Sequence, residues 1–164
     1  MNQRMRLDHT FPPLCEKDSE ILILGSFPSV LSRAQLFYYG NPRNRFWAVL
    51  GSIFHEDIAE DIESKRLFCT RHKIALYDVI ESCDIIGSRD DSIENIVPAD
   101  IQAFVSRSRI RKIVLNGNAA KRYFLQYQSN FDQLHLFFMP STSPANAAWS
   151  LDRLVEKWSE AFRD

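Results

Sequence analysis

The sequence predicts an α/β protein, a three-layer α/β/α sandwich with a central four-stranded parallel sheet. Four short, strongly apolar runs recur along the chain, as expected of strands that are buried on both faces. The segments between them carry apolar residues at helical spacing. Strands that alternate with helices in this way form right-handed crossovers, and therefore a parallel sheet between two helical layers.

The elements expected in the first half are a loop over 1–19, a strand over 21–24, a helix over 45–54, a helix over 56–72 and a strand over 74–80. Residues 1–19 are polar and marked by prolines, which is typical of a loop. Asn44 can cap the first of these helices, and Phe46, Trp47 and Leu50 supply its apolar face. The second helix is indicated by apolar residues that recur among acids.

The elements expected in the second half are a loop over 81–98, a helix over 100–106, a strand over 110–115, a helix over 119–127, a strand over 134–139 and a helix over 146–162. Glycine, serine, arginine and aspartate cluster at 87–91, which indicates a loop rather than a regular element. Loops of that length in a compact domain are often functional. Trp149, Leu154 and Trp158 belong to a long apolar stripe in the last helix.

Length and composition limit the classes of protein that are possible. A chain of 164 residues that is 45% hydrophobic fits one domain over residues 1–164. A net charge of −1 argues against proteins that hold polyanions by bulk charge, so any contact with nucleic acid must be local. No run reaches the length of a membrane span, and the amino terminus does not resemble a secretion signal. We expect a monomer in the cytoplasm with no membrane partner.

The cysteines give no sign of a metal or cluster site. Cys15, Cys69 and Cys83 are odd in number, far apart and without paired spacing. The sequence also contains no Gly-x-Ser-x-Gly elbow, lysine-bearing phosphate loop, His/Glu metal signature or Gly-x-Gly-x-x-Gly motif. We therefore expect neither a metal nor another cofactor.

The ends of the predicted strands carry polar side chains that should meet at one edge of the sheet. The segments concerned are Gly25–Ser29, Tyr77–Asp78, Asn116–Asn118 and Pro140–Asn146. Serine-rich loops that lead into helices can bind phosphate through amides and hydroxyls without positive charge. Composition alone favours a plainer interpretation, in which these serines and the threonine are turn formers and caps.

Individual residues of this edge also have two interpretations. Spacing alone favours Asn44 as a helix cap over Asn44 as a catalyst. Asp78 could be a buried, hydrogen-bonded carboxylate or a group that activates water, and Tyr77 could be a core aromatic. His9, His55, His72 and His135 fall outside the strand ends, so we expect surface or structural roles for all four. A polar edge with Phe27, Tyr38 and Tyr39 for stacking suits a nucleobase.

Several short strings, in this order, resemble the uracil-DNA glycosylase superfamily, and more narrowly its hypoxanthine-DNA glycosylase branch. They are Gly25-Ser26-Phe27-Pro28-Ser29, Asn41-Pro42-Arg43-Asn44-Arg45-Phe46-Trp47, Ala75-Leu76-Tyr77-Asp78-Val79, Ser82-Cys83, Gly87-Ser88, Asn116-Gly117 and Pro140-Ser141-Thr142-Ser143-Pro144-Ala145-Asn146. The resemblance implies a DNA partner, a parallel sheet between helices, and hydrolytic release of hypoxanthine that leaves an abasic site. Most of the superfamily has a polar residue where this chain has Phe27, and the resembled branch gives the water-activating role to the asparagine that is Asn44 here.

The resemblance assigns roles that the residue types alone leave open. Asn44 and Asp78 are the catalytic candidates. The candidates for base binding are Ser26, Phe27, Tyr39, Tyr77 and Asn116. The candidates for DNA binding are Ser29, Arg43, Ser141, Thr142, Ser143, Ala145 and Asn146. Two alternatives stay open at this point: a uracil or thymine mismatch-type glycosylase, and a non-catalytic protein that binds damaged nucleotides.

Overall fold

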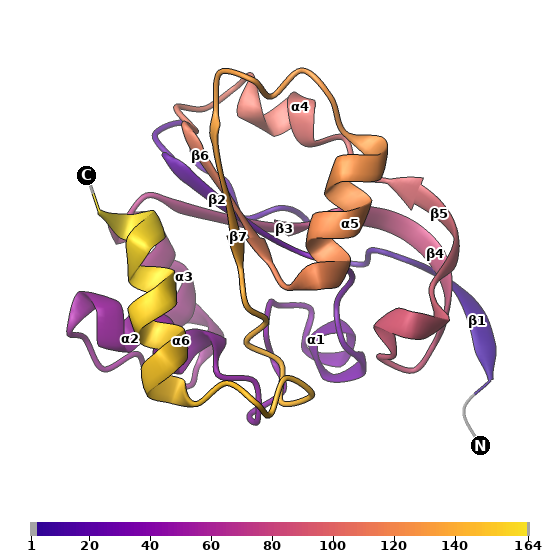
Figure 1. The fold of residues 1–164 in the computed structure, drawn as a ribbon, viewed down its shortest axis with the longest axis horizontal. Helices are drawn as coiled ribbons and strands as arrows, with labels where there is room; N and C mark the ends of the chain where they lie inside the picture. The colour runs from indigo at the N-terminus through magenta and orange to yellow at the C-terminus, as the bar shows by residue number, and fades with distance from the viewer. Residues whose placement is uncertain (1–2, 164) are drawn as a thin grey trace.

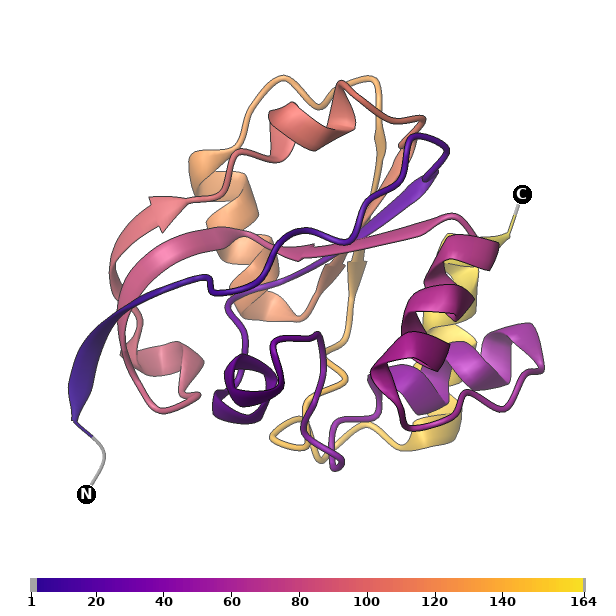
Figure 2. The same ribbon diagram turned by 180° about the vertical axis from the view of Figure 1, so that it is seen from behind.

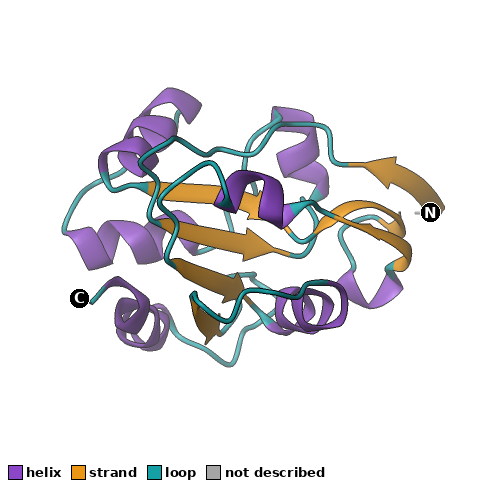
Figure 3. Ribbon diagram, turned by 90° about the horizontal axis from the view of Figure 1, so that it is seen from above, coloured by secondary structure: helices purple, strands orange, loops and turns teal. Residues whose placement is uncertain are grey.

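The parallel sheet is present as predicted in the computed structural model, which describes residues 3–163. Its strand order is β3-β2-β6-β7, and helices lie on both of its faces (Figures 1 and 3). The four strands are β2 (Ile21–Gly25), β3 (Ile74–Asp78), β6 (Lys112–Asn116) and β7 (His135–Met139). Every residue of β2 and β3 is buried, which explains why these strands are continuous apolar runs. The predicted fold class is confirmed.

The helices are α1 (Val30–Gln35), α2 (Phe46–Phe54), α3 (Ile62–Arg71), α4 (Ile101–Val105), α5 (Asn118–Tyr127) and α6 (Leu151–Ser159), with short 3-10 turns η1 (Asp90–Ser92) and η2 (Glu160–Phe162). Two helices begin later than predicted because side-chain caps fix their starts. Asp61 accepts a hydrogen bond from the amide of Ser64, and Ser150 accepts one from the amide of Arg153. Helix α1 was not predicted.

A second sheet corrects two predicted loops. It is antiparallel, has the order β1-β4-β5, and consists of β1 (Arg4–Asp8), β4 (Ile80–Ile86) and β5 (Glu94–Pro98). Part of the loop expected over 1–19 is therefore a strand, and the loop expected over 81–98 is a hairpin. The strand expected over 74–80 ends at Asp78, and the chain continues almost directly into β4 (Figure 2).

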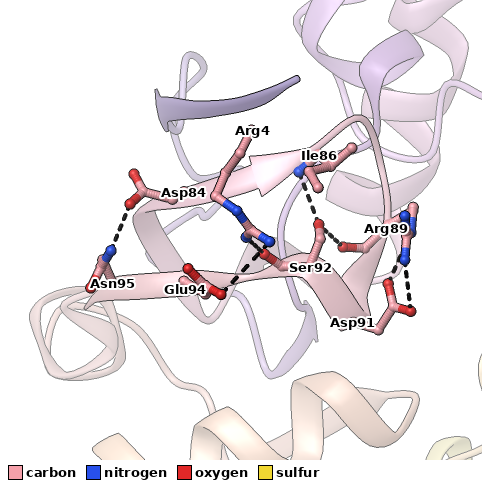
Figure 4. A network of polar contacts seen from close by, with 8 residues as sticks. All are labelled: Arg4, Asp84, Ile86, Arg89, Asp91, Ser92, Glu94 and Asn95. Atoms are coloured by element: carbon pink, nitrogen blue, oxygen red, sulfur yellow. Dashed lines mark hydrogen bonds and ion pairs between the residues drawn. The ribbon is translucent and has the colours of Figure 1, made fainter. Parts of the chain in front are cut away.

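Polar contacts link the strands of this second sheet and the turn between β4 and β5 (Figure 4). Arg4 reaches across β4 to the carbonyl of Ser92 and to Glu94 on the β5 side. The hydroxyl of Ser92 accepts the amide of Ile86 at 2.8 Å and donates to the carbonyl of Arg89 at 2.6 Å. These contacts fix the turn that carries η1, and η1 lies beside the carboxyl edge of the parallel sheet.

The two sheets differ in what their sequences reveal. Strand β1 pairs with β4 over the register Arg4 to Ile86 through Asp8 to Ser82, so its partner lies far along the chain. Four of its five residues are exposed, and no apolar pattern marks it.

No helix within residues 3–163 is long and apolar enough to cross a membrane. The expectation of a single domain over 1–164 stays a prediction.

Candidate active site

The loops at the carboxyl ends of the parallel strands enclose a cavity of about 580 Å³, called the pocket below. This volume lies within the usual range for small-ligand sites. The chain that leaves β2, β6 and β7 runs along this edge, below the sheet in Figure 1. The predicted site residues that line the pocket are Ser26, Phe27, Ser29, Tyr39, Asn44, Asp78, Asn116, Ser141, Thr142, Ser143 and Ala145.

Gly25 of β2 pairs with Asp78 of β3, and both residues line the pocket. A Cβ atom on Gly25 would lie 2.6 Å from Asp78 Oδ1 and 3.3 Å from the hydroxyl of Tyr39. Only glycine therefore leaves room for this carboxylate and this phenol. The Tyr39 ring stacks on Phe46 with centroids 3.8 Å apart, and burial raises the pKa of Tyr39 far above its ordinary value, so its hydroxyl stays protonated.

Asp78 has a buried partner that the sequence did not indicate. His9 Nε2 lies 2.8 Å from Asp78 Oδ2, and the His9 side chain is fully buried. The expectation that all four histidines stand apart from the strand ends is therefore corrected for His9. Its backbone amide donates to the carbonyl of Glu81, which holds the residue beside β4. Because this contact depends on pairing between β1 and β4, no local sequence signal could have found it.

Asn44 belongs to a chain of hydrogen bonds that joins three loops. Its Oδ1 accepts the amide of Phe46 at 2.9 Å and the hydroxyl of Thr142 at 2.8 Å. The same hydroxyl oxygen accepts Asn116 Nδ2 at 3.1 Å, and Asn116 Oδ1 accepts the amide of Thr142 at 3.1 Å. Asn116 Nδ2 also donates to the hydroxyl of Tyr39 at 3.3 Å.

This network determines which way each amide points. Both backbone amides can only donate, so Oδ1 of Asn44 and Oδ1 of Asn116 must be the atoms that face them. The Thr142 hydroxyl accepts a hydrogen bond from Asn116 Nδ2 and donates its own hydrogen bond to Asn44 Oδ1. No hydrogen bond of Asn44 Nδ2 is found among the described residues, and Asn44 lines the pocket, so we infer that this donor is available to a ligand there. The N-cap residue of α2 is Arg45, which makes no side-chain cap bond, and Asn44 one residue earlier accepts the amide of Phe46, the first helical residue. One side chain therefore both satisfies an amide at the start of α2 and lines the pocket.

Thr142 was expected to bind DNA, but its side chain instead supports Asn44 and Asn116. Its side chain is completely buried and committed to Asn44 and Asn116, so it cannot clamp a phosphate through its hydroxyl. The serines on either side remain partly accessible. Ser141 accepts the amide of Ser143 at 3.1 Å, and Ser143 accepts the amide of Ala145 at 3.2 Å. The loop after β7 is therefore a succession of short turns whose hydroxyls are shared with its own backbone.

Arg45 anchors this loop. Its guanidinium donates to the carbonyls of Ser143 at 3.2 Å and Asn146 at 3.0 Å, and also to the carbonyl of Trp149. These bonds account for the late start of α6, because they hold residues 146–149 in a non-helical path. Arg45 therefore serves the protein's own backbone.

Asp90 lies at the mouth of the pocket and was not among the predicted site residues. Its Oδ1 accepts the hydroxyl of Ser26 at 2.7 Å. Desolvation raises the pKa of Asp90 above its ordinary value, and the charge of the nearby Asp78 acts in the same direction. The loop prediction pointed to this region, but which of its acids turns inward depends on the hairpin between β4 and β5.

A second, larger cavity of about 900 Å³ adjoins the pocket and is called the groove below. The two share a wall formed by Asp90, Asp91, Ser141, Ser143 and Ala145. The groove is also lined by the start of α5 and by three cationic side chains, which are Lys121, Arg122 and Lys157. Asn146 lines the groove and not the pocket.

Two predicted site residues lie outside both cavities. The hydroxyl of Tyr77 donates to Glu81 at 2.6 Å, and its ring packs against His9, so it faces the second sheet. Arg43 is exposed on the loop before α2. Within residues 3–163, no group of three or more histidine, cysteine, aspartate or glutamate side chains is arranged to hold a metal ion.

Comparison with known proteins agrees with this geometry. The sequence profile of the Uracil DNA glycosylase superfamily matches residues 12–163. A protein of Methanosarcina acetivorans named hypoxanthine DNA glycosylase is 33% identical over 155 residues, 93% of this chain and 96% of that protein. Its counterpart from Methanosarcina barkeri, with the same name, is 34% identical over the same share.

A solved structure gives the same picture. The solution NMR structure of a Methanosarcina acetivorans protein, provisionally described as a uracil DNA glycosylase, aligns with a TM-score of 0.78 and 33% identity. The alignment covers 93% of this chain and 94% of that one. Sequence profile, curated relatives and solved fold agree over nearly the whole length. The chain belongs to the uracil DNA glycosylase superfamily.

Proposed function

We propose that this protein is a monofunctional DNA glycosylase that flips hypoxanthine out of DNA and hydrolyses its N-glycosidic bond, which leaves an abasic site for base excision repair. Two relatives that match over nearly their full length carry the name hypoxanthine DNA glycosylase. The observation that carries the proposal is the Asn44 amide, which the network of Phe46, Thr142 and Asn116 holds at the pocket.

Base flipping is needed because a paired base hides its glycosidic bond. Extrusion from the stack costs a few kcal/mol and costs least for a mispaired or damaged base, so selectivity begins there. The pocket can hold a planar base against Phe27, whose ring lies in its wall with the Arg33 guanidinium 5.8 Å from the centroid. We expect the flanking phosphates to pass Ser141, Ser143 and the cations of the groove, because these residues line the cavities next to the base site.

The chemical step depends on a correctly positioned water molecule rather than on a strong general base. As the bond loosens, the base departs with the electron pair of the bond and the sugar approaches an oxocarbenium ion, which a neutral water molecule can attack. The proton that this water loses as the new C–O bond forms neutralises the departing base. Asn44 Nδ2 can donate to one lone pair of that water and leave the other free to form the new bond. Such orientation accounts for a substantial part of the rate in enzymes of this kind.

The pocket also supports hydrolysis over strand cleavage. A bifunctional glycosylase attacks the sugar with an amine, and of the described residues that line the pocket none is a lysine. We expect an abasic product with an intact strand, excision that does not respond to chelators, and a protein that acts as a monomer. Separation of the product on a denaturing gel, with and without alkali, checks the first expectation, and an assay in EDTA checks the second.

The central test is single-turnover excision from one duplex series with hypoxanthine, uracil, xanthine or thymine at the same position. We expect hypoxanthine to be released faster than uracil, because Phe27 offers a broad face to a purine. The Asn44→Ala protein, purified in parallel, controls for contaminating activity. Faster release of uracil would instead support the uracil-type activity suggested by the description of the solved relative. Tight binding without release of any base would support a non-catalytic damage-binding protein.

A further inference from the structure

His9 is buried in a setting that its hydrogen-bonding capacity does not match. Its ring packs against Phe11 and Tyr77, with centroids 4.6 and 4.3 Å away, and Phe27 approaches it edge-on at 6.1 Å. Its Nδ1 is the only fully buried side-chain nitrogen or oxygen without a hydrogen-bond partner within residues 3–163. A structural histidine usually satisfies both ring nitrogens. The His9 ring makes a single hydrogen bond, to Asp78, and the packing around the ring holds it in that position.

The two oxygens of Asp78 are used differently. Oδ2 is held by His9 at 2.8 Å. Oδ1 lies over Gly25, in the space that a Cβ atom would fill, and no hydrogen bond to it is found among the described residues. Asp78 also lines the pocket although only 5% of its surface is exposed. One oxygen is therefore fixed from behind while the carboxylate remains available to a ligand in front.

A carboxylate oxygen at this depth can only accept a hydrogen bond. Deamination changes the ring in the way that such an acceptor can detect. Adenine has a bare N1 with a lone pair, whereas hypoxanthine has an N1–H beside its new C6 carbonyl. Uracil and xanthine also have a ring N–H beside a carbonyl. A buried acceptor attracts that N–H and repels the lone pair of the undamaged base, which gives strong discrimination because an unpaired group in the pocket is costly.

We propose that His9 is a positioning residue for base recognition, because it fixes the Asp78 carboxylate as the acceptor that meets the ring N–H created by deamination. This inference rests on the proposed function for the identity of the base. His9 is suited to the task because its Nε2 lies 2.8 Å from Oδ2 and keeps that oxygen occupied in a poorly hydrated place. The aromatic rings around it prevent the pair from swinging away. Selection of the base then depends on a residue that the ligand never touches.

The test uses duplexes that differ only in one purine. One carries 2′-deoxyinosine and the other 2′-deoxynebularine, whose unsubstituted purine has a bare N1 and almost the same shape. Both the single-turnover rate and the equilibrium Kd are measured for each, and the preference for deoxyinosine is expressed as a ratio. For the parent protein we expect preference in both ratios. In His9→Leu we expect the ratios to fall by at least about tenfold.

A conservative variant separates positioning from mere packing. His9→Gln can place an amide nitrogen where Nε2 stands, so part of the preference should return, although the aromatic cage loses its ring. His135→Gln serves as the control, because His135 is exposed at the opposite end of β7 and should leave both ratios at the parent value. A folded His9→Leu protein with an unchanged preference for deoxyinosine overturns the proposal.

A third variant keeps the test decisive if His9→Leu does not fold. In His9→Leu/Asp78→Leu both polar partners become apolar, which avoids a buried unpaired charge and is often tolerated. We expect the same loss of preference as in His9→Leu, because the two residues act as one unit. A parent that binds deoxyinosine preferentially but excises nothing refutes the proposed function and leaves the reading mechanism intact. An active parent whose double variant keeps the preference refutes only the reading mechanism.

Discussion

The pocket and the groove share a wall, yet they hold their polar groups in opposite ways. In the pocket, Asn44, Asn116 and Thr142 are bonded to one another and to backbone amides. In the groove, the Lys121 ammonium lies over the ring of Phe138 at 4.7 Å, and Lys157 pairs with the exposed Glu160 at 3.0 Å. Folding fixes the geometry of the pocket, whereas the cations of the groove can rearrange around a ligand. We infer that the pocket binds the base and hydrolyses its bond, whereas the cations of the groove attract the DNA backbone.

The largest effect should come from Asn44→Ala. If the amide orients the attacking water, single-turnover excision of hypoxanthine should fall by roughly 10²-fold or more, a barrier increase of at least about 2.7 kcal/mol. Binding of damaged DNA should stay near the parent value, because the groove is unchanged. The free energy of unfolding should fall by about 2–3 kcal/mol, because the Phe46 amide and the buried Thr142 hydroxyl both lose their acceptor. Near-parent excision by the folded variant would remove Asn44 from the mechanism and leave Asp78 as the next candidate.

Asn44→Asp then identifies which half of the amide matters. Oδ1 of the new carboxylate can still accept from Phe46 and Thr142, so the cap and the network survive. The group on the pocket side changes from a donor to an acceptor. A rate close to that of Asn44→Ala indicates that the Nδ2 donor holds the water. Substantial recovery of the rate indicates instead that an acceptor suffices.

A smaller effect is expected from Thr142→Val, which keeps the shape of the side chain and removes its hydroxyl. Asn44 and Asn116 each lose one hydrogen bond but keep another, so the free energy of unfolding should fall by about 1–2 kcal/mol. Excision should slow by about tenfold because Asn44 is less firmly held. Thr142→Ser, which restores the hydroxyl, should recover the parent rate. If Thr142→Val excises as fast as the parent, the network does not contribute to positioning.

The same contrast explains what could be predicted from the sequence. The parallel strands are continuous apolar runs because both of their faces are buried, so local composition revealed them and the edge where they end. That edge, together with the resemblance, was enough to select Asn44, Asp78 and Asn116 as site candidates. The second sheet has mostly exposed outer strands, and its pairing joins residues 4–8 to residues 82–86. Nothing local encodes such a contact.

The residues that depend on this second sheet were therefore the ones missed. His9 reaches Asp78 only because β1 continues alongside β4, and Asp90 reaches Ser26 only because the hairpin of β4 and β5 folds back. Tyr77 was expected in the pocket because it precedes Asp78 at a strand end. Successive side chains of a strand point to opposite faces, so a site for one of the pair excludes the other. This alternation follows from the sequence alone, and it favours only one of the two residues for the pocket.

In the groove, Lys121→Ala/Arg122→Ala should alter attraction and leave chemistry alone. For each phosphate that the protein no longer neutralises, the slope of log Kobs against log salt should become shallower by about 1, and affinity should fall most at low salt. At saturating protein the single-turnover rate should stay within about twofold of the parent. Lys17→Ala is a matched control, since Lys17 is exposed before β2, at the opposite edge of the sheet. An unchanged salt slope in the double variant would show that DNA does not follow the groove.

The smallest effect concerns Asp90, which lines both cavities and so tests the boundary between them. Desolvation raises the pKa of Asp90 in the folded protein above its ordinary value of 3.8. The folded protein is therefore not destabilised by Asp90 below pH 3.8, where the acid is neutral in both states, and it loses stability as the pH rises through the folded pKa. Asp90→Asn keeps a partner for Ser26 and cannot ionise. The variant should therefore be more stable than the parent at neutral pH, by at most about 2 °C in Tm for a side chain this exposed, and the gap should close on acidification.

Asp91 provides the control of opposite sign next to it. Its hydrogen bonds to Arg89 lower its pKa, so its contribution to stability is present above its ordinary value and is lost as the pH falls. Asp91→Asn should thus be slightly less stable than the parent at neutral pH, by little because both partners are exposed. Thermal unfolding of the three proteins between about pH 2.5 and pH 7 compares the slopes, because this range includes both the raised pKa of Asp90 and the lowered pKa of Asp91. Removal of either charge should also tighten DNA binding a little, because both acids face the groove. If Asp90→Asn and Asp91→Asn shift Tm in the same direction across this range, Asp90 is not desolvated by the pocket, and the two cavities are one open surface.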